Sequence, residues 1–165
     1  ADGRPIMPNE LSGLVHEESV RLSDEIKRRC LMAGESVLIE GTLNWPPLID
    51  LFLSDLARYR YDNLAIISVD VPKSVALQRA EDRWWTDRSD TSNLNGGRFV
   101  SRAVIEASYH VNGTSFGRIH AVQLADQARR PGITVTLESV GESGAVSNYA
   151  SPSVSSSVRD PGPPE

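Results

Sequence analysis

The stretch "LAIISVD", residues 64–70, is an apolar, β-branched run. Short runs of this kind are typical of strands that are buried on both faces of a parallel sheet. Two further runs resemble it, "SVLIE" at residues 36–40 and "ITVTLE" at residues 133–138. We therefore expect three buried strands.

Helical patterns separate these expected strands. Residues 11–32 place apolar side chains mostly four or seven apart and stop before Gly34, which indicates an amphipathic helix. Further helices are predicted from their apolar spacing and their starting prolines, at residues 46–61, 72–85, 99–109 and 115–129. Strands that alternate with helices predict an α/β fold, a parallel sheet with flanking helices.

The organisation of the chain suggests that this sheet is N-terminally incomplete. Three strands are few for a covered sheet, and the helix at 11–32 has no preceding strand to pack on. Residues 86–97 are polar and end in glycines, so we expect a mobile loop there. We expect one domain over residues 1–140 and a disordered tail over 141–165, which is rich in Ser, Gly and Pro.

Composition narrows the class of protein. The chain has 165 residues, 39% of them hydrophobic, and no apolar run long enough to span a membrane or to serve as a signal peptide. We therefore expect a cytoplasmic protein. The net charge of -5 argues against a nucleic-acid-binding surface. The single cysteine, Cys30, cannot form an internal disulfide, and no Cys or His pair has metal-ligand spacing.

A carboxylate at the end of an apolar strand is the first candidate for chemistry. Glu40 ends the run at 36–40, and Gly41 and Thr42 follow it. In open α/β sheets, ligands bind at the carboxyl ends of the strands. Glu40 could hold or deprotonate a hydroxyl there, with Thr42 pointing the same way. The alternative is that Glu40 caps the helix that starts at Pro46 or pairs with an arginine.

Two arginines are the second candidate. Arg83 lies near the end of its expected helix, whereas Arg79, one turn earlier, is more plausible as part of a solvated face with acidic neighbours. Arg98 follows Gly96 and Gly97, an arrangement with which a closing loop can bring positive charge onto a phosphoryl group. The alternative is a glycine helix boundary with an exposed arginine.

Taken together, "SVLIEGTL", "VPKSVALQRAEDRWW" and "GGRFVSRAVIE" resemble the zeta toxin family, over a span from about Leu11 to Leu137. Members of this family are kinases of the P-loop NTPase fold that phosphorylate UDP-N-acetylglucosamine or a similar UDP-linked amino sugar. The resemblance implies that Glu40 and Thr42 bind the sugar nucleotide and that Arg83 and Arg98 contact the ATP phosphates. By position, Asp2 corresponds to the family's catalytic aspartate.

One departure from the family is large. The loop that cradles phosphates needs glycine amides and a lysine, as in GxxxxGK[ST], and neither Lys27 nor Lys73 follows a glycine. ATP and Mg²⁺, which the resemblance implies, would then be held mainly by residues outside this chain. We expect the C-terminal portion of a longer kinase, so that the chain as given has little activity. A trimmed, inactive descendant is the other interpretation.

The sequence leaves three functional hypotheses. The first is an ATP-dependent kinase that acts on a UDP-N-acetyl amino sugar, with an antitoxin protein as a plausible partner. The second is a non-catalytic module that binds a nucleotide sugar or a protein. The third is a kinase of the same fold that acts on another hydroxyl, because the fold does not determine the acceptor.

Overall fold

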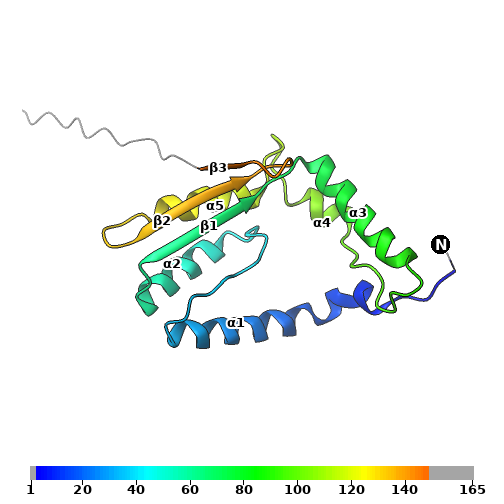
Figure 1. Cartoon of the computed structure of the whole chain (residues 1–165), viewed down its shortest axis with the longest axis horizontal. Helices are drawn as coiled ribbons and strands as arrows, with labels where there is room; N and C mark the ends of the chain where they lie inside the picture. Colours follow the sequence, from blue (N-terminus) through cyan, green and yellow to red (C-terminus); the bar gives the residue numbers. More distant parts are fainter. Residues whose placement is uncertain (1–2, 149–165) are drawn as a thin grey trace, which may run out of the picture.

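A computed structural model describes residues 3–148 of the chain (Figure 1). Its centre is a small mixed sheet with the strand order β1-β2-β3. Strands β1 (Asn63–Val69) and β2 (Thr134–Val140) are parallel, with Ile66 opposite Leu137. The short β3 (Val146–Asn148) pairs antiparallel with β2. Two of the three predicted strands, 64–70 and 133–138, are thus confirmed within one or two residues. The prediction that they are buried on both faces is wrong for β1, because its residues alternate between exposed and half-buried and only one of its faces is covered by a helix.

The helices cover one side of this sheet. Helix α5 (Phe116–Ala128) packs on β1 and β2, and α2 (Pro47–Tyr59) packs on α5. The core cluster lies between α5 and the sheet, where Ala121 and Ala125 meet Leu137. Because alanines face the strands, the helix axis approaches the sheet closely. The expected α/β class, with helices that flank a sheet, is therefore confirmed.

The first helix departs from its prediction. Residues Pro8–Val15 form a 3-10 helix, η1, and α1 covers His16–Met32. In the described chain, α1 contacts only η1 and α2 among the regular elements, and it runs along the edge of the molecule in Figure 1. Its predicted core face is mostly exposed: only Leu31 is buried, while Leu22 and Ile26 face solvent. The pattern is amphipathic, but no described element covers its apolar side.

The strand predicted at 36–40 is wrong. Residues 35–44 have no regular secondary structure, and Leu38 is 91% exposed. A strand needs a neighbour for its backbone hydrogen bonds, and in the described residues β1 pairs only with β2, so its other edge is open. The apolar run has no described strand beside it and stays irregular. The prediction of a wholly parallel sheet fails as well, because the third strand is β3.

The remaining differences are local. Helix α3 (Lys73–Ser89) continues four residues past the predicted end at Trp85, and the helix expected at 99–109 shortens to α4 (Arg102–Glu106). Residues 141–148 of the expected tail form a turn and β3, and the rest of that tail lies outside the described residues. Across residues 3–148, no helix is both long and apolar enough to cross a membrane.

Candidate functional site

The segment that carries Glu40 and Thr42 is fixed by the residues that follow it. The buried His120 of α5 has its Nδ1 2.6 Å from the backbone oxygen of Leu43, so this nitrogen donates a hydrogen bond to that carbonyl. A Cβ at Gly117 would lie 2.6 Å from the Thr42 oxygen, so this position of α5 has to be glycine for the close approach. These contacts dock residues 42–43 on the first half of α5.

The two side chains predicted to bind the sugar nucleotide, Glu40 and Thr42, make no contact of their own with described side chains through hydrogen bonds or ion pairs. Glu40 and Thr42 are both exposed, and among the described residues neither side chain has a hydrogen-bond or ion-pair partner. Helix α2 has no side-chain cap, so the alternative in which Glu40 caps that helix is wrong. The pairing of Glu40 with an arginine is likewise absent from residues 3–148. The carboxylate is available to a ligand.

The segments that carry Arg83 and Arg98 meet at Trp84. A Cβ at Gly97 would lie 2.2 Å from the backbone oxygen of Trp84, so the loop backbone touches α3 next to Arg83. Phe99 packs edge-on against the Trp84 ring, with 5.7 Å between ring centroids. Both arginines are exposed, and in the described part of the chain no carboxylate pairs with either. Arg79, expected on a solvated face with acidic neighbours, is exposed as well and forms no ion pair with a described residue.

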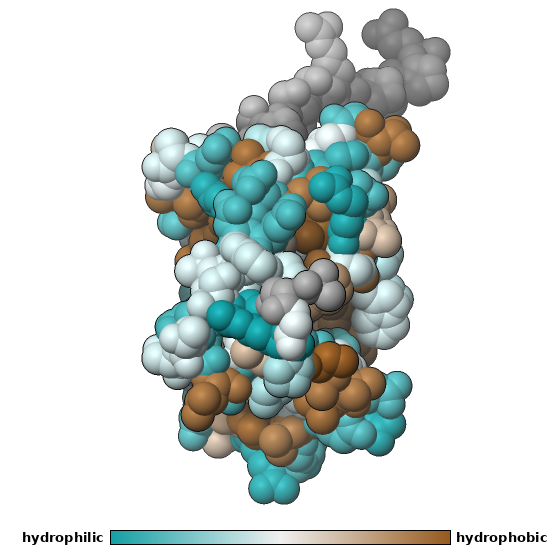
Figure 2. All heavy atoms as spheres, turned by 90° about the vertical axis from the view of Figure 1, so that its right-hand side faces the viewer, coloured by the Kyte–Doolittle hydropathy of each residue, from teal (hydrophilic) through white to brown (hydrophobic). Residues whose placement is uncertain are grey.

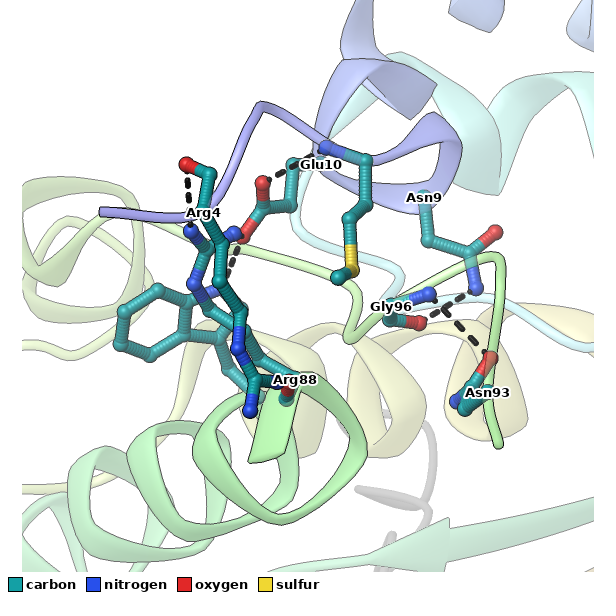
Figure 3. Close-up of polar contacts among 8 residues, drawn as sticks. Arg4, Asn9, Glu10, Arg88, Asn93 and Gly96 are labelled. Atoms are coloured by element: carbon teal, nitrogen blue, oxygen red, sulfur yellow. Dashed lines mark hydrogen bonds and ion pairs between the residues drawn. The ribbon is translucent and has the colours of Figure 1, made fainter. Parts of the chain in front are cut away.

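A buried polar cluster holds the N-terminal segment on this loop and helix (Figure 3). The Arg88 guanidinium donates to Glu10 Oε1 at 2.6 Å, and the two side chains are only 9% and 11% exposed. The Trp84 indole donates to the same oxygen at 2.9 Å, and the backbone N–H of Met7 donates to Oε2 at 3.0 Å. The Met7 bond, followed by those of Trp84 and Arg88, lowers the pKa of the Glu10 carboxyl.

The sequence analysis missed a carboxylate that does lie at the end of a strand. Asp70 directly follows β1, and its Oδ1 accepts a hydrogen bond from the Ser115 hydroxyl at 2.7 Å. Arg118 of α5 lies 3.6 Å from Asp70 Oδ2 and donates to the Ser139 hydroxyl at 3.0 Å. The position of Asp70 after "LAIISV" was the available signal. Its partners could not be read from the sequence, because they come from α5 and β2.

The structure thus forms two groups from the predicted site residues. Glu40 and Thr42 lie on one segment beside α5, and Arg83 and Arg98 lie on two segments that meet at Trp84. No hydrogen bond or ion pair in the described chain links the two groups. Asp2 lies outside the described residues, and within them no cluster of three His, Cys, Asp or Glu could hold a metal ion. Figure 2 faces the end with the N-terminal segment and shows hydrophobic side chains in separate patches among hydrophilic ones.

Comparison with known proteins agrees with the resemblance. The family model described as "Zeta toxin" matches residues 4–139, which is most of the chain. No curated protein and no solved structure matches it. The matched span includes η1, the irregular segment with Glu40, both arginine segments and β2 up to Ser139. The chain therefore belongs to the zeta toxin family, whose members have the P-loop fold.

Proposed function

We propose that the chain acts in the ATP-dependent phosphorylation of a hydroxyl of a UDP-N-acetyl amino sugar, with Glu40 and Thr42 at the acceptor and Arg83 and Arg98 at the phosphates. The family match over residues 4–139 is the observation that carries this proposal. Glu40 and the two arginines near Trp84 support it, since none of the three has an ion-pair partner within residues 3–148. Such a reaction needs a ligand for the acceptor hydroxyl and positive charge near the transferred phosphoryl group.

Each residue has a role in this proposal. Glu40 accepts a hydrogen bond from the acceptor hydroxyl and orients it, and Thr42 binds the sugar beside it. Arg83 and Arg98 donate to the phosphoryl oxygens as charge spreads over them. Asp2 takes the proton of the acceptor hydroxyl, a role that its place in the family pattern suggests. Because Gly97 packs on Trp84, the two arginines would act from one side of the phosphoryl group.

These residues do not include the kind of phosphate-binding loop and metal ligands that normally hold ATP and Mg²⁺. The 165 residues contain no GxxxxGK[ST] segment, and the described ones contain no cluster of metal-ligating side chains. Mg²⁺ in kinases is held mostly by phosphates and one or two protein oxygens. We therefore assign no catalytic step to a metal bound by this chain. An antitoxin that covers the phosphate side of the site is the partner that the family suggests.

The test is phosphoryl transfer by the complete gene product that includes these residues, with ATP and UDP-N-acetylglucosamine as substrates. We expect Arg83→Ala and Arg98→Ala each to lower kcat about 100-fold or more. Glu40→Gln should lower kcat/KM with the sugar nucleotide. Arg79→Ala is the matched control, because Arg79 lies one turn before Arg83 on the same helix, is also exposed, and has no assigned role. Full turnover by both site-arginine variants would refute the assigned roles.

A second candidate function is a module that binds the nucleotide sugar without catalysis, and the exposed carboxylate of Glu40, which has no partner among the described residues, would serve it equally. It predicts that UDP-N-acetylglucosamine binds in calorimetry with an affinity that ATP does not change, and that no product forms. Glu40→Gln would weaken binding in that case as well. Product formation by the complete gene product, lost in Arg98→Ala, decides for the kinase.

A further inference from the structure

A cleft lies between Arg98 and the N-terminal helices. It has a volume of about 410 Å³. One wall is Arg98, and the other is a face of η1 and the start of α1, lined by Asn9, Ser12, Val15, His16 and Ser19. Asn9 and Ser12 are one 3-10 turn apart, and Ser12, His16 and Ser19 follow at α-helical spacing. The helical repeat therefore aligns an amide, two hydroxyls and an imidazole along one cleft wall.

One backbone and one side-chain hydrogen bond of Asn9 join the two walls of the cleft, and Figure 3 shows the side-chain bond. The N–H of Asn9 donates to the oxygen of Asn95 at 2.9 Å, and the Asn9 side-chain amide donates to the oxygen of Gly96 at 2.8 Å. The Asn93 side chain accepts from the N–H of Gly96 at 3.2 Å. Gly96 has a φ of 69°, and a Cβ there would lie 2.5 Å from the sulfur of Met7. Arg98, two residues later, is thereby held opposite the helical wall.

The charge of the cleft favours an anion. None of its lining residues is acidic, and Arg98 has no acidic partner among the described residues, although the chain as a whole is negative. A guanidinium presents several N–H donors in the geometry that suits phosphate oxygens, and hydroxyls and imidazole add further donors. The cleft therefore has the chemistry of a phosphate site, with a guanidinium on one side and hydroxyl and imidazole donors on the other.

We propose that this cleft binds the phosphate chain of a nucleotide, with Arg98 on one side and Ser12, His16 and Ser19 donating from the other. The inference rests on the proposed kinase function for the identity of its ligands, ATP or the UDP-sugar, both of which carry a diphosphate. Asn9 has a different part: its amide is already used by Gly96, so it positions the loop. Ser12, His16 and Ser19 thus become binding residues that the family resemblance did not assign.

The experiment is isothermal titration of the full chain with ADP, UDP-N-acetylglucosamine and inorganic pyrophosphate. We expect Ser12→Ala, His16→Ala and Ser19→Ala each to weaken binding of one nucleotide about tenfold, the effect of one lost hydrogen bond to a charged group. Arg98→Ala should weaken it at least as much. The nucleotide whose binding is weakened by these substitutions is the one whose phosphates lie in the cleft. Circular dichroism checks that each variant is folded.

Two matched controls belong to this titration. Ser23→Ala removes a hydroxyl one turn beyond Ser19 on α1, outside the cleft, and Arg102→Ala removes an exposed arginine that pairs with Glu106 at 3.5 Å. Both should bind as the unaltered chain does. If Arg98→Ala weakens binding but the three wall variants do not, the cleft is refuted while the kinase proposal stands. Absence of binding by all three probes also refutes the cleft, and the turnover assay then judges the kinase separately.

Discussion

At the scale of single residues, the charge of the Glu10 carboxylate contributes to the stability of the fold. Its carboxylate accepts hydrogen bonds from the Met7 N–H, the Trp84 indole and Arg88, which lower its pKa below the ordinary value of 4.5. A lowered pKa in the folded state means stability that is present above pH 4.5 and is lost as the pH falls through the folded pKa. We expect the free energy of unfolding to fall on acidification from pH 5 toward pH 3, and Glu10→Gln to flatten that fall. Urea unfolding across this range measures it.

Glu25 supplies the control for this prediction. Hydrogen bonds from Arg28 and then Arg29 lower its pKa to about 2, but the pair lies on the exposed surface of α1. Exposed ion pairs are weak and are screened by salt. We expect the effect of Glu25→Gln to be small and to vanish at about 0.5 M salt, where the Debye length is only a few Å. An equally salt-sensitive effect of Glu10→Gln would contradict its burial against Arg88.

At the scale of elements, the contact between the loop and α3 depends on Gly97. An added Cβ would lie 2.2 Å from the Trp84 oxygen, a backbone atom that can move only with the helix. We expect Gly97→Ala to destabilise the fold by about 1–3 kcal/mol, as overpacking does, and to displace Arg98. Gly13→Ala is the control, because nothing lies within 4 Å of a Cβ at Gly13. Hydrogen exchange of residues 93–100 should rise in the first variant and stay unchanged in the second.

The segment that carries Glu40 depends on its contact with α5. His120 Nδ1 donates to the Leu43 oxygen from a buried position, and the Phe116 ring stacks on His120 with 6.0 Å between centroids. His120→Phe would keep a ring of similar shape but leave the Leu43 carbonyl unpaired, at a cost of about 1–3 kcal/mol. We expect faster hydrogen exchange and proteolysis at residues 38–44. His120→Gln, which can still donate to that carbonyl, should restore much of the protection, and equal loss in both variants would contradict the assigned bond.

Elements that depend on local sequence patterns could be predicted from the sequence, whereas those that depend on contacts between distant residues could not. Helices α2, α3 and α5 and strands β1 and β2 follow from local periodicity and from starting prolines. The run at 36–40 has the same local pattern as β1, but a strand also needs a partner, and pairing is not encoded locally. For the same reason Glu40 and Arg98 could be proposed from sequence motifs, whereas the partners of Asp70 and the cleft beside Arg98 are visible only in the tertiary structure.

At the scale of the whole molecule, the outer edge of β1 and one face of the sheet are open within the described residues. Strand β1 has no partner on its outer edge in the described chain, and Ile67 and Val69, on the face away from α5, are 62% and 71% exposed. Open edges with apolar side chains promote association between chains. We therefore expect the 165-residue chain to self-associate as its concentration rises. Ile67→Lys should suppress this association, because it places a charge on the edge strand.

Sedimentation velocity over a hundredfold concentration range, run for the chain and two variants, tests this expectation. Lys at position 67 would stand opposite Glu138 in the register of β1 and β2, so the substitution should be tolerated in the folded sheet. Val104→Lys is the matched control: it adds the same charge at an apolar position of α4 that is 60% exposed and lies outside the sheet. Association that weakens in the first variant and persists in the second locates the contact at β1. A chain that stays monomeric throughout, or equal association in both variants, would show that the open edge does not drive assembly.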